Sequence, residues 1–320
     1  MKKALLYIAY TLAYGFWWVM SLLPLWVLYR LSDLLYYVIT YVVRYRHDVI
    51  WNNLSTSFPE KSEAELREIE HQFYHWFCDY LVETVKLMSI SKRQLMQRMT
   101  FTGMEQIHEI LSEGQSIGVY LGHLGNWEWI TSLPYWTSNG LCCQLYHPLE
   151  NEYFDRLFKY VRELHGALCI PMQESLRKII TLSREGKPLI VGYISDQVPL
   201  WWNIHHWVDF LNHDTPVLTG AERIVKHTGQ AFFYGHVTRV KRGHYNCEMR
   251  LISRKTKEMA DFEITDLYYK ELERSIKNQP ELYLWSHNRW KRTREEFNKN
   301  WEVKNGKVVK RKKEQPQPQG

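Results

Sequence analysis

The residues best suited to chemistry in this sequence lie in one short segment, Gly122–Glu128, which reads GHLGNWE. An apolar run, residues 116–121, precedes it and predicts a buried strand. A histidine at the carboxyl end of such a strand faces the usual ligand site of an α/β fold. A glutamate five residues later can accept one imidazole N–H and leave the other nitrogen free to take a proton from a hydroxyl. The segment therefore predicts His123 as a general base, with Glu128 as its orienting carboxylate.

The same segment also predicts the surroundings of the reaction. A helix predicted over residues 126–137 places the backbone N–H groups of Gly125 and Asn126 at its start, where they can stabilise an oxyanion and contact substrate. The sequence contains no G-x-S-x-G nucleophile elbow, P-loop or H-E-x-x-H motif. These features favour direct transfer within a ternary complex over a covalent acyl-enzyme.

Short β-rich runs alternate with helical runs after residue 99, and this alternation predicts an α/β fold with a mixed sheet flanked by helices. The predicted strands are residues 116–121, 141–146, 188–194, 231–240 and 245–252, the last two of them paired. The predicted helices are residues 126–137, 151–165 and 216–228. Ser62–Glu65 has the spacing of a capping box and predicts the start of a helix that runs to about Ser89.

The N-terminus predicts a membrane-anchoring helix. Residues 4–29 form a run of 26 residues without a charge, roughly 39 Å long if helical, whereas a bilayer core is about 30 Å thick. Gly15 and Pro24 interrupt this run. A second apolar stretch, residues 34–43, is too short to span, and two alternatives remain open for it: it lies in the interface, or it completes a re-entrant hairpin. We therefore expect a membrane anchor and interfacial segment at 1–47, a catalytic domain at 48–302 and a disordered basic tail at 303–320.

Charge and cysteine content narrow the functional classes. The formal net charge is +6, and residues 303–320 alone carry six Lys or Arg and one Glu, so the fold itself is near neutral and nucleic-acid binding is not predicted. The five cysteines show no C-x-x-C pair, and buried, reduced thiols indicate a catalytic domain in the cytoplasm. His71 and His75 stand four apart without an acidic partner and are interpreted as packing residues. We expect no metal and no cofactor.

Taken together, four segments resemble the late acyltransferases of lipid A biosynthesis, the lauroyl/myristoyl transferase family with a His-x4-Asp/Glu motif. They are GHLGNWE at 122–128, VIWNNLSTSFPE at 49–60, SDQ at 195–197 and PELYLWSHNRWK at 280–291. The resemblance spans roughly residues 1–292 and implies a glycerolipid-acyltransferase-like fold. It also implies a single anchor in the inner membrane, with the catalytic domain facing the cytoplasm. The implied donor is an acyl-carrier-protein thioester, and the implied acceptor is a hydroxyl of a lipid A precursor.

The resemblance also suggests further site residues. Arg162 matches an arginine of the family's substrate pocket, and Asp196 matches an acid near the site. Arg289 lies beside Trp290 in a basic segment, which fits either contact with a phosphate or phospholipid or a plain basic helix end. The stretch Trp201–Trp207 departs from the family pattern, which leaves two alternatives open: an acyltransferase for a phosphoglycolipid or aminolipid, and a non-catalytic lipid-binding homologue.

Overall fold

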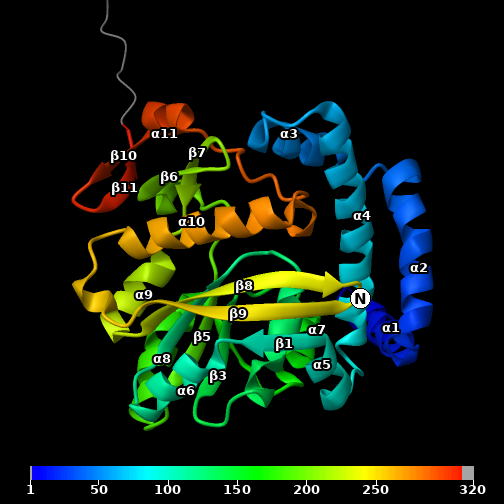
Figure 1. Ribbon diagram of the computed structural model, residues 1–320, viewed down its shortest axis with the longest axis horizontal. Helices are drawn as coiled ribbons and strands as arrows, with labels where there is room; N and C mark the ends of the chain where they lie inside the picture. Colours follow the sequence, from blue (N-terminus) through cyan, green and yellow to red (C-terminus); the bar gives the residue numbers. More distant parts are fainter. Residues whose placement is uncertain (1, 312–320) are drawn as a thin grey trace, which may run out of the picture.

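The computed structural model describes residues 2–311, and its centre is a seven-stranded mixed sheet with the order β1-β9-β8-β2-β5-β3-β4. Five neighbouring strands, from β8 to β4, run parallel, whereas β9 pairs antiparallel with β8 and parallel with β1. Helices cover both faces of this sheet (Figure 1). The predicted α/β fold with a mixed, helix-flanked sheet is thus confirmed.

The strands of the main sheet are β1 (Met99–Thr102), β2 (Ile117–Leu121), β3 (Leu141–Tyr146), β4 (Leu168–Pro171), β5 (Leu189–Ile194), β8 (Ala231–Lys241) and β9 (His244–Ser253). Two hairpins lie outside it, β6 (His206–Phe210) with β7 (His213–Val217), and β10 (Trp301–Lys304) with β11 (Lys307–Lys310).

The α-helices are α1 (Lys2–Leu22), α2 (Leu25–Tyr37), α3 (His47–Ser57), α4 (Glu63–Lys86), α5 (Lys92–Arg98), α6 (Met104–Ser112), α7 (Glu152–Glu163), α8 (Ser175–Arg184), α9 (Gly220–Thr228), α10 (Glu263–Asn278) and α11 (Arg294–Asn300). A π-helical turn occupies Val38–Val42, and 3-10 turns occupy Trp127–Tyr135, Met172–Glu174, Trp201–Asn203, Thr256–Glu258 and Pro280–Leu282.

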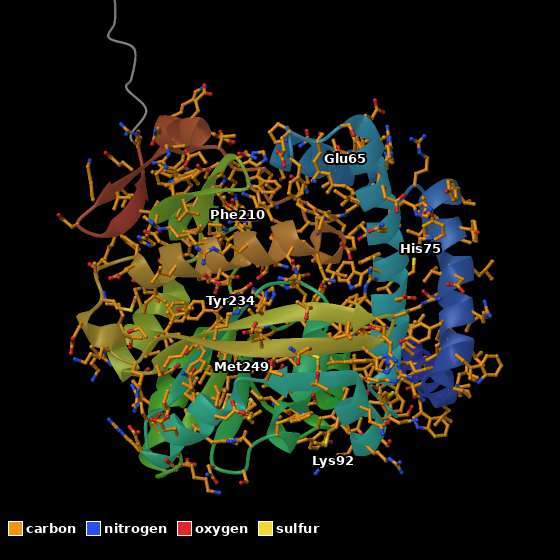
Figure 2. The ribbon with its side chains drawn as sticks, viewed as in Figure 1. Glu65, His75, Lys92, Phe210, Tyr234 and Met249 are labelled. Carbon is orange, nitrogen blue, oxygen red and sulfur yellow. The ribbon has the colours of Figure 1, made fainter. Side chains whose placement is uncertain are left out.

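Alternate side chains of the central strands enter two hydrophobic cores, as the two-residue period of a strand requires. Tyr120 of β2 packs with α3, α4, α9 and α10, whereas Val119 and Leu121 pack with α5, α6 and α7. Tyr234 and Met249 likewise lie in opposite cores, Tyr234 on the side of α10 (Figure 2). Because strands buried on both faces must be apolar at every position, the short apolar runs of the sequence are reliable strand signals.

The N-terminal helices do not form one straight anchor. The chain bends by 117° between α1 and α2, at Leu23 and Pro24, and among residues 2–311 no single helix is long and apolar enough to cross a membrane. The two helices together pass that test by length and composition. The apolar run at 4–29 is therefore not one straight helix: it breaks at Pro24, the interruption that the sequence indicates, because proline lacks the N–H that would continue the helix of α1.

Both N-terminal helices pack against the rest of the protein. Leu28 and Tyr36 of α2 are fully buried, and Tyr36 stacks on His75 of α4 with their ring centroids 3.6 Å apart. The capping box predicted at Ser62 is present, with reciprocal bonds between Ser62 and Glu65 at the start of α4. These contacts make α4 the helix that joins the N-terminal segment to the core.

Two predicted segments need correction. Residues 213–217 form strand β7, whereas the sequence predicts a helix from residue 216 and no element for 213–215, so that α9 begins only at Gly220. Residues 301–310 form the β10–β11 hairpin, so the part of the predicted disordered tail from 303 to 310 is folded; residues 312–320 lie outside the described part of the chain. In this segment Trp301, Val303 and Val309 are interspersed with charged residues, a pattern that favours a hairpin. The prediction of disorder considered only the basic composition and did not use this pattern.

Candidate active site

The site lies where two neighbouring parallel strands end. Strands β2 and β5 pair in register from Ile117 with Ile190 to Leu121 with Ile194, so the residues that follow them meet at one edge of the sheet. Two consecutive tyrosines of α10 hold this edge. Tyr268 donates a hydrogen bond to the carbonyl of Leu121 (2.8 Å), and Tyr269 donates one to the carbonyl of Ser195 (2.9 Å). The ends of both strands are therefore fixed by a third element.

His123 and Asp196 form the central pair of this edge. One oxygen of the Asp196 carboxylate lies 2.6 Å from Nδ1 of His123, and the other accepts the backbone N–H of the same residue at 2.9 Å. The imidazole Nε2 is left facing the Gln197 amide, 3.4 Å away, and Trp127 packs edge-on against the ring. This geometry fixes the tautomer with the proton on Nδ1 and leaves Nε2 available to accept a proton.

The ionised state of Asp196 is stabilised although the residue is only 2% exposed. Burial by itself raises the pKa of this carboxyl, but the His123 imidazole, its two N–H donors and the Arg289 guanidinium outweigh burial and hold the pKa below its usual range. Arg289 is itself 1% exposed and donates to the Pro216 carbonyl and the Tyr269 hydroxyl. Because Arg289 is buried behind the His123–Asp196 pair, its guanidinium is not accessible for the predicted contact with substrate.

Glu128 does not hold His123, contrary to the sequence-based prediction. Its two oxygens accept hydrogen bonds from Nε and Nη2 of Arg162, at 2.8 and 2.6 Å. Burial alone would lower the pKa of Arg162, but the hydrogen bonds and the negative charge of Glu128 outweigh burial, and the pKa is raised above its usual value. The two residues therefore form a bidentate ion pair. The predicted α-helix at 126–137 is a 3-10 helix over Trp127–Tyr135, and the altered turn directs Glu128 toward α7 and away from the imidazole.

The loop between His123 and Trp127 is held by the C-terminal segment. The N–H of Gly125 bonds the carbonyl of Leu282 (2.9 Å), and the carbonyl of His123 accepts from Leu284 (3.1 Å). Gly125 has a φ of +61°, and a Cβ there would lie 2.7 Å from Val237, so only glycine fits. Since its N–H is already bonded, Gly125 cannot supply the predicted oxyanion contact.

Asn126 is fully buried and belongs to an internal network. Its side-chain oxygen caps the 3-10 helix by accepting from the N–H of Trp129 (3.0 Å), and its amide donates to Glu83 of α4 (2.7 Å). Glu83 also accepts from the hydroxyls of Tyr29 (2.9 Å) and Tyr245 (3.0 Å). The predicted substrate contact of Asn126 is therefore replaced by a positioning contact, and sequence analysis missed Glu83 because only the fold brings it to the loop.

The pKa of Glu83 is raised from 4.5 to about 7. Burial is the largest cause and the Asp79 carboxylate is the second, and they act against the three hydrogen bonds that Glu83 accepts. The folded protein therefore binds a proton at Glu83 at neutral pH that the unfolded chain has released.

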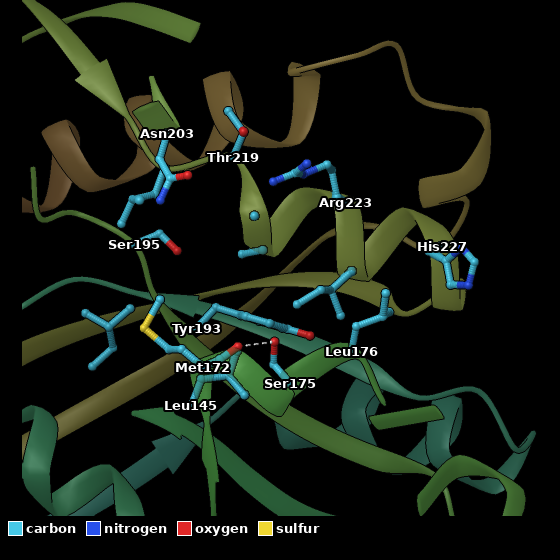
Figure 3. Close-up of a pocket in the computed structure, with 15 residues that line it drawn as sticks. Leu145, Met172, Ser175, Leu176, Tyr193, Ser195, Asn203, Thr219, Arg223 and His227 are labelled. Atoms are coloured by element: carbon cyan, nitrogen blue, oxygen red, sulfur yellow. Dashed lines mark hydrogen bonds between the residues drawn. The ribbon is translucent and has the colours of Figure 1, made fainter. Parts of the chain in front are cut away.

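A cavity of about 530 Å³ lies at the end of β5, where Tyr193, Ile194 and Ser195 line it (Figure 3). Ser195 lines it and directly precedes Asp196. The walls are largely apolar, with Leu145, Met172 and Leu176 on one side, while Arg223 and His227 of α9 are polar groups at its edge. The Trp201–Trp207 stretch contributes only Asn203, because Trp201 and Trp207 lie against Arg292 and Arg294.

The remaining candidate groups have structural roles. All five cysteines are free and buried, as predicted. Burial lowers the pKa of His287 to about 4, and the neutral ring accepts the N–H of Val198 just after the Asp196 loop. Across residues 2–311, no group of three His, Cys, Asp or Glu side chains is arranged to hold a metal ion.

The family model described as bacterial lipid A biosynthesis acyltransferase matches residues 1–292. No curated protein sequence matches the chain.

The raised pKa of Glu83 predicts how stability depends on pH. Between about pH 4.5 and 7 the folded state holds a proton that the unfolded state has released, so the contribution of Glu83 to the free energy of unfolding falls as pH rises through this window. Glu83→Gln should remove this fall. The free energy of unfolding of the variant minus that of the wild type should therefore be up to about 3 kcal/mol larger above pH 7 than at pH 4.5. Urea unfolding of both proteins from pH 4.5 to 8 measures the difference. Glu68→Gln, an exposed position on the same helix, is the control, and parallel wild-type and Glu83→Gln curves would contradict the prediction.

Proposed function

Because the chain belongs to the bacterial lipid A biosynthesis acyltransferase family, we propose that it transfers a fatty acyl chain from an acyl-carrier-protein thioester to a hydroxyl of a lipid A precursor. The observation that carries the proposal is the His123–Asp196 pair. It leaves one imidazole nitrogen free at the edge of the sheet, next to an apolar cavity. A hydroxyl acceptor, a base and a site for an acyl chain are the three requirements of this reaction.

The proposed reaction follows from the fixed tautomer of His123. The free Nε2 accepts the proton of the acceptor hydroxyl while that oxygen attacks the thioester carbonyl. The ionised Asp196 stabilises the imidazolium that forms, as the carboxylate does in a Ser-His-Asp triad. The tetrahedral intermediate collapses by breaking the carbon–sulfur bond, and the imidazolium returns the proton to the thiolate. An ester and a free thiol result, and His123 is neutral again.

Glu128 and Arg162 have a revised role in this proposal. Glu128 holds the Arg162 guanidinium by two hydrogen bonds, and the Arg162 side chain keeps 26% of its surface exposed. A guanidinium oriented in this way is a donor to a carbonyl or phosphate oxygen of substrate. We propose Arg162 as a substrate contact and Glu128 as the residue that positions it.

We assign the 530 Å³ cavity to the acyl chain of the donor. Its volume lies within the usual range of small-molecule sites, about 300–1,000 Å³. Ser195 lines the cavity and directly precedes Asp196, which contacts His123, so the cavity and the base meet at the end of β5. Gly220 lines the cavity, and a Cβ placed there meets no heavy atom within 4 Å, so there is room for a side chain to shorten the cavity.

We also propose that α1 and α2 hold the protein at the cytoplasmic face of the inner membrane. Large hydrophobic side chains are exposed on both helices, including Leu12 and Phe16 (69% each) and Trp26 (70%). A continuous set of exposed apolar and aromatic groups of this kind marks a membrane or protein contact. The 117° bend of the pair lets both helices lie along one surface.

Removing the base should abolish transfer without unfolding the protein. We expect His123→Ala to lower kcat by about 10²- to 10⁴-fold. Asp196→Asn should cause a comparable loss, because an amide neither fixes the tautomer nor stabilises the imidazolium. Transfer from acyl-carrier-protein thioester is measured with purified protein, and His108→Ala, an exposed histidine on α6, is the matched control. Near wild-type turnover of His123→Ala would refute the proposed base.

Filling the cavity should change the preferred chain length. Gly220→Leu is expected to lower kcat/KM for long acyl donors by at least about tenfold more than for short ones. One unaccommodated methylene in an apolar pocket is worth about 1–3 kcal/mol. Competition between donors of different length gives the ratio directly. Thr181→Leu, at an exposed position on α8, serves as the control. An unchanged ratio for Gly220→Leu would place the acyl chain elsewhere.

Charges on the exposed face of α1 and α2 should release the protein from membranes. We expect Phe16→Lys with Trp26→Lys to move most of the protein into the soluble fraction on carbonate extraction, with Tm unchanged because both side chains are largely exposed. Val303→Lys, an exposed apolar position on the C-terminal hairpin, should stay membrane-bound. Retention of the double variant at the wild-type level would mean that another surface holds the protein.

A further inference from the structure

A second cavity, of about 430 Å³, shares no lining residue with the cavity assigned to the acyl chain. It is enclosed by the π-helical turn after α2, the loop that leads into α3 and the first half of α4 (Figure 1). Its lining is rich in cationic and polar groups: Arg44, His47, Arg67, Glu70, His71 and Tyr74. None of these residues takes part in the chemistry described above.

Arg44 is the cationic group of this cavity that the protein itself leaves uncompensated. Arg67 is already bonded to Glu63 and Glu70 and stacks on Trp51. Within residues 2–311, Arg44 makes no hydrogen bond or ion pair with another side chain, and the nearby Thr40 hydroxyl is buried without a partner. An anionic ligand would supply the acceptors that both groups lack.

The backbone around Arg44 is held in an unusual conformation. Arg44 and Arg46 have φ values of +51° and +52°, in the left-handed region that non-glycine residues rarely adopt. Such residues cost about 1–3 kcal/mol each and persist where the surroundings impose them. Tyr45, between the two arginines, has its carbonyl held by the buried Tyr74, and Arg46 donates to the carbonyl of Ser286. Arg44 is therefore the cation of this loop that faces the cavity.

The segment before Arg44 gives this cavity its setting. Tyr41, Val42 and Val43 expose 61%, 77% and 60% of their surfaces. Aromatic and apolar residues of this kind occupy the membrane interface, and cations directly after them meet the headgroups. The charge of Arg44 and the position of the cavity thus fit a phosphate carried by an amphiphile.

The cavity is also connected to the active site. Tyr74 precedes Tyr80 by six residues on α4, a rise of roughly 9 Å, and Tyr80 packs against Trp127, whose ring lies against His123. Arg46, in the same loop, donates to the carbonyl of Ser286 (2.8 Å), in the segment that backs the His123 loop. The cavity and the His123 loop are therefore linked through directly contacting residues.

We propose that this cavity binds a phosphate group of the anionic lipid that accepts the acyl chain, with Arg44 as the principal contact. The proposal rests on the function proposed above and adds a recognition site for the acceptor headgroup. An anionic phospholipid of the surrounding bilayer and free phosphate carry the same chemistry, and the experiment separates these sources.

The test compares Arg44→Asn with Arg30→Gln in the full-length protein at 0.15 M salt. Asparagine tolerates the left-handed backbone, so Arg44→Asn removes the charge without adding strain. Arg30 is an exposed cation on α2, outside the cavity, so Arg30→Gln removes an equal charge without changing the cavity. A hydrogen bond to a charged group is worth about 1.5–3 kcal/mol, so Arg44→Asn should raise the KM for a phosphorylated acceptor by roughly 10- to 100-fold, with kcat little changed. Arg30→Gln should leave KM near wild type, and Arg44→Lys should restore most of the loss.

Three results would overturn the proposal. An equal rise of KM in Arg44→Asn and Arg30→Gln would indicate general attraction to an anionic surface. Loss of wild-type affinity for the acceptor on adding phosphatidic acid vesicles, but not phosphatidylcholine vesicles, would assign the cavity to bulk phospholipid. Competition by millimolar inorganic phosphate would assign it to the free ion. Failure of the proposed function looks different: wild type would not transfer acyl chains, yet its binding to vesicles containing the acceptor would still depend on Arg44.

Discussion

The two hydrogen bonds that Asp196 accepts from His123 are the constraint on which the rest of the site depends. They exist because β2 and β5 are parallel neighbours that end at the same edge of the sheet. Each strand end is then fixed from outside, through Tyr268 at Leu121 and Tyr269 at Ser195. With both the backbone and the ring of His123 bonded to one carboxylate, the imidazole has a single orientation before any substrate arrives, which is the preorganisation that catalysis by a general base requires.

The surrounding charges are buried, and each acts through a partner. Removing a buried charge from water costs several kcal/mol unless hydrogen bonds and an opposite charge compensate it. The Asp196 carboxylate has His123 and Arg289, and the Glu128 carboxylate has Arg162. Glu83 lacks a cation and instead has a raised pKa with three hydrogen-bond donors. The polar groups behind the site are thus arranged to hold the loop at 122–128 in one conformation.

Sequence reasoning identified five of the seven strands of the main sheet, missed the short edge strands β1 and β4, and found His123 but assigned it the wrong partner. Spacing along the chain suggested Glu128, on the assumption that an α-helix begins at Asn126. The C-terminal segment bonds Gly125 and His123 and leaves a 3-10 turn in place of that helix, so Glu128 reaches Arg162. Asp196 lies 73 residues from His123, and only the order of the strands brings them together. The resemblance marked Asp196 as near the site, whereas Glu83, on a different helix, carried no local signal.

The N-terminal segment is bonded directly to the residues that support the active site, although the sequence suggested an anchor separate from the catalytic domain. Glu83 of α4 accepts from Tyr29 of α2 on one side and from Asn126 of the catalytic loop on the other. Leu28 and Tyr36 are buried in the same two cores that support the sheet. Because α2 is bonded to Glu83 of α4, the position of the N-terminal helices is linked through α4 to the loop at 122–128 and the edge of the sheet. Under the function proposed above, the exposed side of α1 and α2 meets the lipid, and this link sets the height of His123 above it.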